Sequence, residues 1–158
     1  MNERGRSTDR VRAAAEAAGL PFEIRRMPAS TRTAEEAAAA CGVEVGQIVK
    51  SLVFRKAESR EPVLLLVSGA NRVDPAAMKA VFGEPIERMD ADAVRAETGF
   101  AIGGVAPLGS LAPIATFMDA DLFAYGKIWA AAGAPNAVFQ ATPDALAAAT
   151  RARILPMR

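Results

Sequence analysis

The chain has 158 residues, of which 51% are hydrophobic and 23% are charged. This length suits one domain, residues 1–158, that buries a core of its own. No apolar run approaches the roughly 20 residues that cross a bilayer, and no apolar segment of a secretory signal follows the charged N-terminus. We therefore expect a cytoplasmic protein that has no membrane partner.

The formal net charge of the chain is +1. A charge this close to balance provides no basic field of the kind that drives nonspecific DNA binding, so DNA is not expected as a partner. Local arginine clusters, the first between Arg4 and Arg12, are interpreted as solvated surface. A small basic patch for a structured RNA is the alternative.

The absence of histidine excludes more chemistry than any other count. It rules out Ser-His-Asp and Cys-His nucleophile pairs, histidine-ligated zinc and imidazole as a general base. The single cysteine, Cys41, is interpreted as a small buried apolar residue. The glycine motifs of nucleotide-binding folds are also missing. We expect no metal and no cofactor, so chemistry must come from lysine, carboxylates, hydroxyls, backbone N–H groups or the substrate.

The N-terminal part of the chain predicts a helix followed by a short strand. Ser7 or Thr8 caps the helix, and Gly19 ends it. Residues 1–6 before this cap are expected to form a flexible tail. The strand is expected over residues 21–27.

A second helix and the strongest strand pair come next. Thr33 and Glu36 have the spacing of a capping box, and Gly42 ends the alanine-rich helix that they begin. Strands are expected over residues 47–55 and 62–68, joined by a polar link that is typical of a hairpin loop. The second strand is apolar on both faces, which predicts a central position in its sheet.

The second half of the chain predicts short strands and three more helices. The helices, each with a capping residue before it, are expected over residues 75–82, 91–98 and 143–150. Strands are expected over residues 85–89, 100–102, 114–118, 127–131 and 137–140, and residues 151–156 form a last short strand or a tail. Several hairpins and few βαβ units predict an α+β fold with a mixed, largely antiparallel sheet.

Lys50 occupies an unusual place in its expected strand. Side-chain alternation puts it on one face with Ile48, Leu52 and Phe54, which are large and apolar, so this face is expected to be the core side. Two explanations remain open. The lysine reaches out of a sheet edge, or its ammonium projects into a pocket for an anionic or carbonyl-bearing ligand.

The segment IGGVAPLGSLAP, residues 102–113, interrupts the aliphatic sequence around it. Gly103 and Gly104 can adopt positive φ and allow a ligand to approach the backbone. Consecutive N–H groups in such a turn can hold an anion or stabilise an oxyanion. By itself the segment is better explained as a plain turn, because most clusters of glycine and proline are turns and nothing more.

Five segments together resemble the YbaK/prolyl-tRNA-synthetase-associated editing domain family. They are STRTAEEAA, GQIVKSLVF, LLLVSGANRVD, TGFAIGGVAPLG and GAPNAVFQATPDAL, and they follow the order of the family from Thr31 to Thr150. The motifs IVKSLVF and GGVAP, when both occur at this separation and in this order, are specific for the family. The resemblance implies a partly barrel-like mixed sheet surrounded by helices.

The activity implied by this resemblance is hydrolysis of mischarged aminoacyl-tRNA. The expected substrate is tRNA(Pro) carrying a small wrong amino acid such as alanine, cysteine or serine, and the chain is expected to act in trans as a free-standing editor. Prolyl-tRNA synthetase is a further expected partner. The alternative is a non-catalytic module of the same fold that binds tRNA or a synthetase. An unrelated hydrolase is disfavoured because the sequence indicates no nucleophile–base pair.

The resemblance also implies the residues of the site. Lys50 matches the family's lysine and would position the substrate, while the N–H groups of Gly103, Gly104, Val105 and Ala106 in the GxxxP loop would stabilise the oxyanion. The nucleophile would be water or the thiol of a cysteinyl substrate. The remaining expected substrate-binding residues are Thr31, Ser51, Ser68, Gly69, Pro107, Gly133 and Asn136.

Other polar and aromatic residues have simpler interpretations. Asp119 and Asp121 are interpreted as turn residues, and Trp129 and Phe139 as core. Some relatives carry a histidine in the loop around Gly133. This chain has none, which leaves the identity of the amino acid open.

Overall fold

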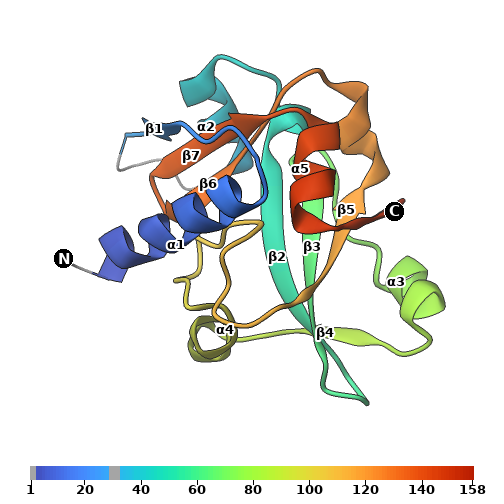
Figure 1. Ribbon diagram of the computed structural model, residues 1–158. Coiled ribbons are helices and arrows are strands. Elements are labelled where there is room, and N and C mark those ends of the chain that lie inside the picture. The colour runs from blue at the N-terminus through green and yellow to red at the C-terminus, as the bar shows by residue number, and fades with distance from the viewer. Residues whose placement is uncertain (1–2, 29–32) are drawn as a thin grey trace.

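The computed structural model describes residues 3–28 and 33–158. The α-helices in this part of the chain are α1 Glu3–Ala17, α2 Ala34–Cys41, α3 Pro75–Phe82, α4 Ala91–Thr98 and α5 Pro143–Thr150 (Figure 1). The strands are β1 Ile24–Arg26, β2 Val49–Lys56, β3 Pro62–Ser68, β4 Ile86–Arg88, β5 Ala115–Asp119, β6 Ile128–Ala134, β7 Ala137–Ala141 and β8 Arg153–Leu155. Two 3-10 helices are η1 Val45–Gln47 and η2 Ala120–Ala124.

The predicted caps set the helix boundaries. The side chains of Asp74, Asp90 and Thr142 accept hydrogen bonds from backbone N–H groups in the first turns of α3, α4 and α5. Thr33 does the same for α2 and donates its hydroxyl hydrogen to the Glu36 carboxylate. These four helices begin where the sequence predicts.

The start of α1 differs from the prediction. The helix begins at Glu3, so residues 3–6 are helical and not a tail, and residues 1–2 lie outside the described residues. Ser7 and Thr8 are buried inside the helix and do not cap it. A Cβ on Gly133 would lie 2.9 Å from backbone atoms of Ser7, so α1 packs directly on β6. Because of this contact the helix extends through Ser7 and Thr8, although serine and threonine locally favour the position just before a helix begins.

The strand expected over residues 100–102 is also absent. Phe100 is fully buried in the main core, and Gly104 donates its N–H to the carbonyl of Ala101 at 3.0 Å, which closes a turn. Phe100 therefore packs in the core as part of a loop and not as part of a strand, while Ile102 is exposed. Residues 151–156, in contrast, do contain a strand, β8.

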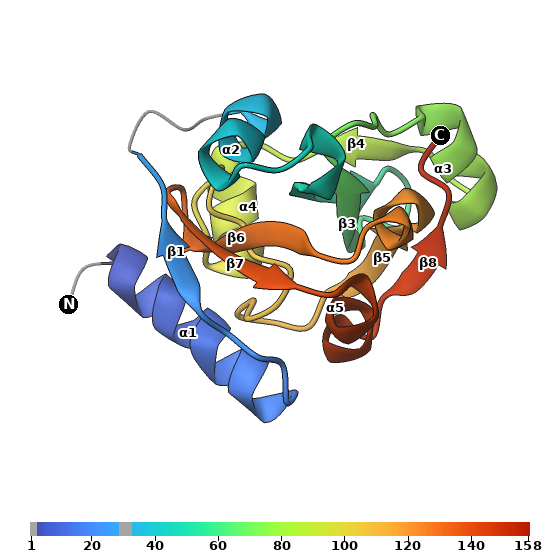
Figure 2. The ribbon, with the colours of Figure 1, turned by 90° about the horizontal axis from the view of Figure 1, so that it is seen from above.

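The strands form two open sheets. Their orders are β4-β2-β3-β5-β8 and β1-β7-β6 (Figure 2). Among the strands of the described chain, β3 pairs with β5 and β5 with β8 in parallel, and the other strand pairs are antiparallel. The mixed, largely antiparallel α+β fold is confirmed. The expected partly barrel-like closure is a loose description, because the sheets stay separate apart from an isolated bridge between Ile48 and Trp129.

Strand β3 lies at the centre of both hydrophobic clusters. Leu64 and Leu66 belong to the main core with β6, β7 and α1, while Val63, Leu65 and Val67 face a second cluster that includes Met78 of α3. Its central position is thereby confirmed. Lys50 shares a face with Leu52 and Phe54, which pack on the second cluster, whereas Val49 and Val53 of β2 enter the main core.

Candidate functional site

A cavity of about 690 Å³ lies where β2 has no neighbouring strand. Strand β4 pairs only with Phe54–Lys56, so the rest of this edge of β2 is uncovered. The cavity is lined by β2, α2, β6 and the segment after α4. Lys56 donates its N–H to Glu61, so the alternate residues Ser51 and Val53 direct their backbone groups away from β3 and toward this edge. The pairing of Phe54 with Arg88 engages the Val53 carbonyl, so in the described chain Ser51 is the residue that presents its backbone groups to the cavity without a partner strand.

Lys50 lines this cavity from β2. Its side chain is partly buried, and Nζ donates a hydrogen bond to the backbone carbonyl of Asn71. Burial lowers the pKa of the Lys50 ammonium, and the nearby Arg72 charge lowers it further. The lysine lies at a strand edge that the described chain leaves uncovered and that is also the cavity wall. The role of its ammonium toward a ligand stays a prediction.

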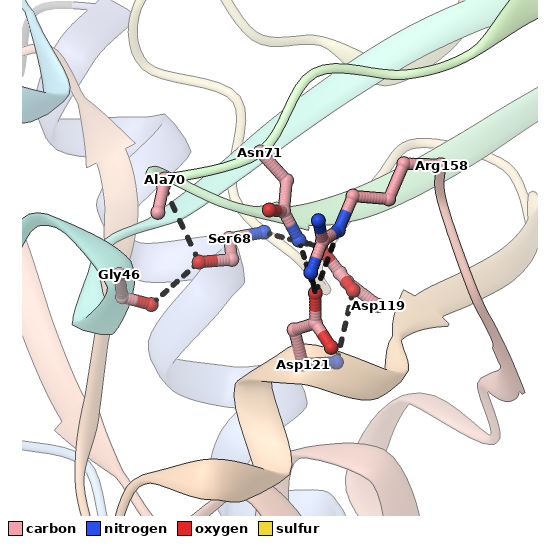
Figure 3. A network of polar contacts seen from close by, with 7 residues as sticks. All are labelled: Gly46, Ser68, Ala70, Asn71, Asp119, Asp121 and Arg158. Carbon is pink, nitrogen blue, oxygen red and sulfur yellow. Dashed lines mark hydrogen bonds and ion pairs between the residues drawn. The ribbon is translucent and has the colours of Figure 1, made fainter.

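A buried polar network holds Asn71 in place (Figure 3). The Asn71 amide nitrogen donates to the Asp119 carboxylate at 2.9 Å and to the Asp121 carboxylate at 2.7 Å. Asp119 is fully buried and also accepts the backbone N–H groups of Ser68 and Asp121. Hydrogen bonding from Asn71 and the charge of Arg158 lower the pKa of Asp121. The network connects the Lys50 contact to the end of β5.

Asp119 has a second role besides the turn role that the sequence predicts: it also holds Ser68 and Asn71. As predicted, it acts at a turn, where it caps η2. Its bond to Asn71 spans 48 residues of the chain, so local sequence contains no signal for it. The sequence analysis therefore missed Asn71 and Asp119 as neighbours of the site.

The glycine loop, which we define as residues 101–108, forms another wall of the cavity. Its first four residues make a turn closed by the Gly104 N–H, and Gly103 has φ 90°, as the third residue of a type II turn requires. Gly103 and Val105 line the cavity. In the described chain the N–H groups of Val105 and Ala106 have no protein acceptor, although both residues are buried. Gly104 uses its own N–H within the turn.

Four of the predicted site residues line the cavity: Lys50, Ser51, Gly103 and Val105. The Ser51 hydroxyl is buried and has no hydrogen-bond partner in the described chain, and the same holds for the Trp129 indole nitrogen. Trp129 is part of a small apolar cluster, as predicted, but it also lines the cavity. The sequence analysis missed this second property.

Other predicted residues lie outside the cavity lining and have structural contacts. Ser68 donates its hydroxyl hydrogen to Gly46 at 2.8 Å. A Cβ on Gly69 would lie 2.4 Å from the Val45 carbonyl oxygen, and Gly133 contacts α1. Asn136, in the β6–β7 turn, accepts the Met27 N–H through its backbone carbonyl at 2.6 Å.

The remaining predicted residues are Gly104, Ala106, Pro107 and Thr31. The first three lie in the glycine loop, where they are buried behind the lining residues. Thr31 lies outside the described residues. Phe139 is fully buried in the main core, as predicted.

Cationic and sulfur groups complete the surroundings of the cavity. Arg88 lines it, and the Arg25 guanidinium carbon lies 5.6 Å from the centre of the Trp129 ring. Cys41 is only partly buried, with its sulfur 3.8 Å from that of Met27. Burial raises the pKa of the Cys41 thiol, which disfavours a reactive thiolate.

Residues 3–28 and 33–158 contain no cluster of three His, Cys, Asp or Glu side chains that could hold a metal ion. No helix in these residues has the length and apolar character of a membrane span.

Fold and cavity together define an α+β protein with a largely apolar ligand site that contains one partly buried ammonium group. The model of the aminoacyl-tRNA editing domain family matches residues 28–149. The chain belongs to this family. The predicted resemblance, and with it an aminoacyl-tRNA editing enzyme, is confirmed at the level of the family.

Individual relatives agree with this assignment. A crystal structure titled as that of "a putative trans-editing enzyme for prolyl tRNA synthetase" is 46% identical, with a TM-score of 0.90 and 96% of each chain covered. The "Uncharacterized protein YwhH" of Bacillus subtilis is 29% identical over 78% of each chain. The "Putative Cys-tRNA(Pro)/Cys-tRNA(Cys) deacylase EbsC" of Enterococcus faecalis is 27% identical over 75% of this chain and 72% of its own.

Proposed function

We propose that the protein is a trans-editing deacylase that hydrolyses the ester of mischarged tRNA. The proposed substrate is tRNA(Pro) carrying a small wrong amino acid such as alanine, cysteine or serine, and the proposed partner is prolyl-tRNA synthetase. The observation that carries the proposal is the cavity that Lys50 and the glycine loop both line. The names of two relatives support the reaction and this tRNA. Because charged tRNA is used in protein synthesis, we place the activity in the cytoplasm.

The glycine loop would stabilise the transition state. The ester carbonyl would lie against the N–H group of Val105, which lines the cavity and lacks an acceptor in the described chain, with Gly103 as a further candidate donor. Ala106 is fully buried behind the lining residues, so its N–H would not reach the ester in the observed conformation. Gly104 would contribute by shaping the turn and not by donating. Donors arranged beforehand around a developing oxyanion are among the strongest electrostatic contributions to catalysis.

Hydrolysis then needs only water and the substrate. The oxygen of a water molecule adds to the ester carbonyl carbon, and the carbonyl electron pair moves to the oxygen held by the loop. Collapse of this intermediate breaks the bond to the ribose oxygen, which leaves with a proton that comes from the water. With a cysteinyl substrate the thiol is an alternative nucleophile. This scheme is compatible with a chain that has no histidine.

Lys50 would position the terminal nucleotide of the tRNA. Its ammonium lines the cavity and is anchored on the Asn71 carbonyl, which leaves two further N–H donors for a phosphate or ribose oxygen. Arg88 at the same cavity adds positive charge. The backbone groups of Ser51, which face the cavity at the edge of β2 that no described strand covers, offer hydrogen bonds to the aminoacyl or nucleoside part.

The direct test measures loss of the ester from tRNAs charged separately with alanine, cysteine, serine, threonine and proline. We expect hydrolysis of at least one small, wrong aminoacyl ester and sparing of prolyl-tRNA(Pro). Lys50→Ala should reduce kcat/KM by about tenfold to a hundredfold, the range for a lost hydrogen bond to a charged group. Lys79→Ala, which removes an exposed lysine of α3, is the matched control.

Inactivity toward every charged tRNA would contradict the deacylase. A gel shift with uncharged tRNA then tests the non-catalytic binding module. Full activity of Lys50→Ala would leave the deacylase in place and remove the role assigned to the lysine.

A further inference from the structure

Arg10 of α1 contacts both ends of the segment that contains the glycine loop. Its Nη2 donates to the carbonyl of Gly99 at 2.9 Å, and its Nε donates to the carbonyl of Gly109 at 3.2 Å. The guanidinium carbon also lies 5.1 Å from the centre of the Phe100 ring. One side chain thereby joins Gly99, two residues before the glycine loop, to Gly109, the residue directly after it.

Further contacts hold the same segment on α1. The Ser7 hydroxyl donates to the Gly99 carbonyl at 3.3 Å, and the Leu111 N–H donates to Thr98 at 3.1 Å. A Cβ on Gly109 would lie 3.0 Å from the Cα of Val11, so the backbone of the segment lies directly against the helix. Helix α1 precedes the region matched by the family model, which begins at residue 28.

From this geometry we infer that Arg10 is a positioning residue that holds the glycine loop in its observed conformation. The loop is not part of a helix or strand, so the hydrogen bonds at its two ends determine how far its N–H groups can move. Arginine suits this task because its planar guanidinium presents two donors in a fixed relative orientation. The catalytic consequence rests on the proposed function of the loop, whereas the ordering of the loop by Arg10 does not.

Arg12 provides a matched control on the same helix. Its guanidinium carbon lies 5.3 Å from the centre of the Phe22 ring, which belongs to the chain between α1 and β1. Replacing it removes the same charge and a similar cation–π contact without touching the segment from Gly99 to Gly109. A difference between the two variants therefore reports the loop contacts of Arg10.

The experiment compares Arg10→Ala, Arg10→Lys and Arg12→Ala with the native chain. For each variant we measure the hydrogen exchange of the backbone amides of residues 103–106, the unfolding midpoint, and kcat and KM on a mischarged tRNA. In Arg10→Ala we expect these amides to exchange about tenfold faster or more, because the open loop becomes more populated. We expect kcat to fall about tenfold or more, with KM within about threefold, because the loop donors lose their alignment.

Arg10→Lys should lie between the native chain and Arg10→Ala in both exchange and kcat, and Arg12→Ala should match the native chain. Native exchange and native kcat in Arg10→Ala would overturn the inference. If Arg10→Ala does not fold, Arg10→Lys decides, and native values in that variant overturn the inference. If the native chain hydrolyses no charged tRNA, the proposed function fails, while the exchange rates still decide whether Arg10 orders the loop.

Discussion

The Lys50 ammonium donates its hydrogen bond to the backbone carbonyl of Asn71, whose side chain is held by the buried carboxylate of Asp119 and the half-exposed carboxylate of Asp121. The cationic group of the cavity is thus anchored on a rigid polar network and not on an opposite charge. Such an anchor leaves the positive charge of Lys50 available for a ligand, because a carbonyl neutralises no charge.

The first prediction concerns the titration of Lys50. Its pKa is lowered in the folded chain by burial and by Arg72. In the pH window between the folded and unfolded values the unfolded chain holds the proton more strongly, so the Lys50 contribution to stability rises with pH there. Below the folded pKa the full cost of burying the ammonium is present.

NMR of the lysine Cε resonances measures this directly. We expect the Lys50 midpoint to lie below the ordinary value of a lysine side chain. Lys50→Met should abolish this part of the pH dependence of stability. A Lys50 midpoint at the ordinary value contradicts the prediction.

A second prediction concerns the buried network. Asp119→Ala removes the acceptor of Ser68, Asn71 and Asp121 from a fully buried position. We expect the free energy of unfolding to fall by about 1–3 kcal/mol or more, because buried donors lose their partner. Urea denaturation measures the loss.

Asp121→Ala is the control for this network. Its carboxylate is about half exposed and pairs with exposed Arg158 at 3.2 Å, so its loss should be smaller than that of Asp119→Ala. An equal loss of unfolding free energy in the two variants would contradict the prediction that the burial of Asp119 makes its hydrogen bonds contribute more to stability.

A third prediction follows from the close approach of Gly104 to the β6–β7 turn. A Cβ at this position would lie 3.1 Å from backbone atoms of Ala134, so Gly104→Ala must shift the glycine loop and the β6–β7 turn apart by a few tenths of an ångström. We expect deacylation to fall about tenfold or more, the effect of a small misplacement of reacting groups. Gly126→Ala is the matched control, since a Cβ there meets nothing within 4 Å. Native kcat in Gly104→Ala would show that the loop tolerates the shift.

A fourth prediction uses the two cavity polar atoms that have no protein partner. Ser51→Ala and Trp129→Phe each remove one buried polar atom whose loss breaks no hydrogen bond of the described chain. For Ser51→Ala we expect the free energy of unfolding to stay within about 0.5 kcal/mol, since no partner is left unpaired. Both variants should raise KM for the mischarged tRNA severalfold if these atoms bond the substrate.

The comparison of KM with stability separates a ligand contact from a structural one. Thr8→Val is a useful control, because Thr8 also has a buried hydroxyl without a partner but packs between α1 and β6, away from the cavity lining. Unchanged KM in Ser51→Ala and Trp129→Phe would contradict the prediction.

Local signals account for much of what could be predicted. Capping residues such as Asp74 and Asp90 act within one turn of chain, so they locate helices without knowledge of the fold. Although α1 ends before Gly19 as predicted, the start of α1 and the segment around Phe100 could not be placed in this way. Their conformations depend on contacts with residues far away, namely β6 and the main core.

By itself, the sequence determined the N-terminal caps of α2 to α5, the central position of β3, the absence of histidine chemistry and the resemblance that identifies the family. Only the tertiary structure decided that Lys50 is anchored on Asn71, that Gly104 uses its N–H in a turn, and that Arg10 reaches both ends of the glycine loop. The physical reason is the range of the interactions. Caps and alternation act between neighbours in the chain, whereas a cavity is assembled from side chains and backbone groups that meet only after the chain has folded.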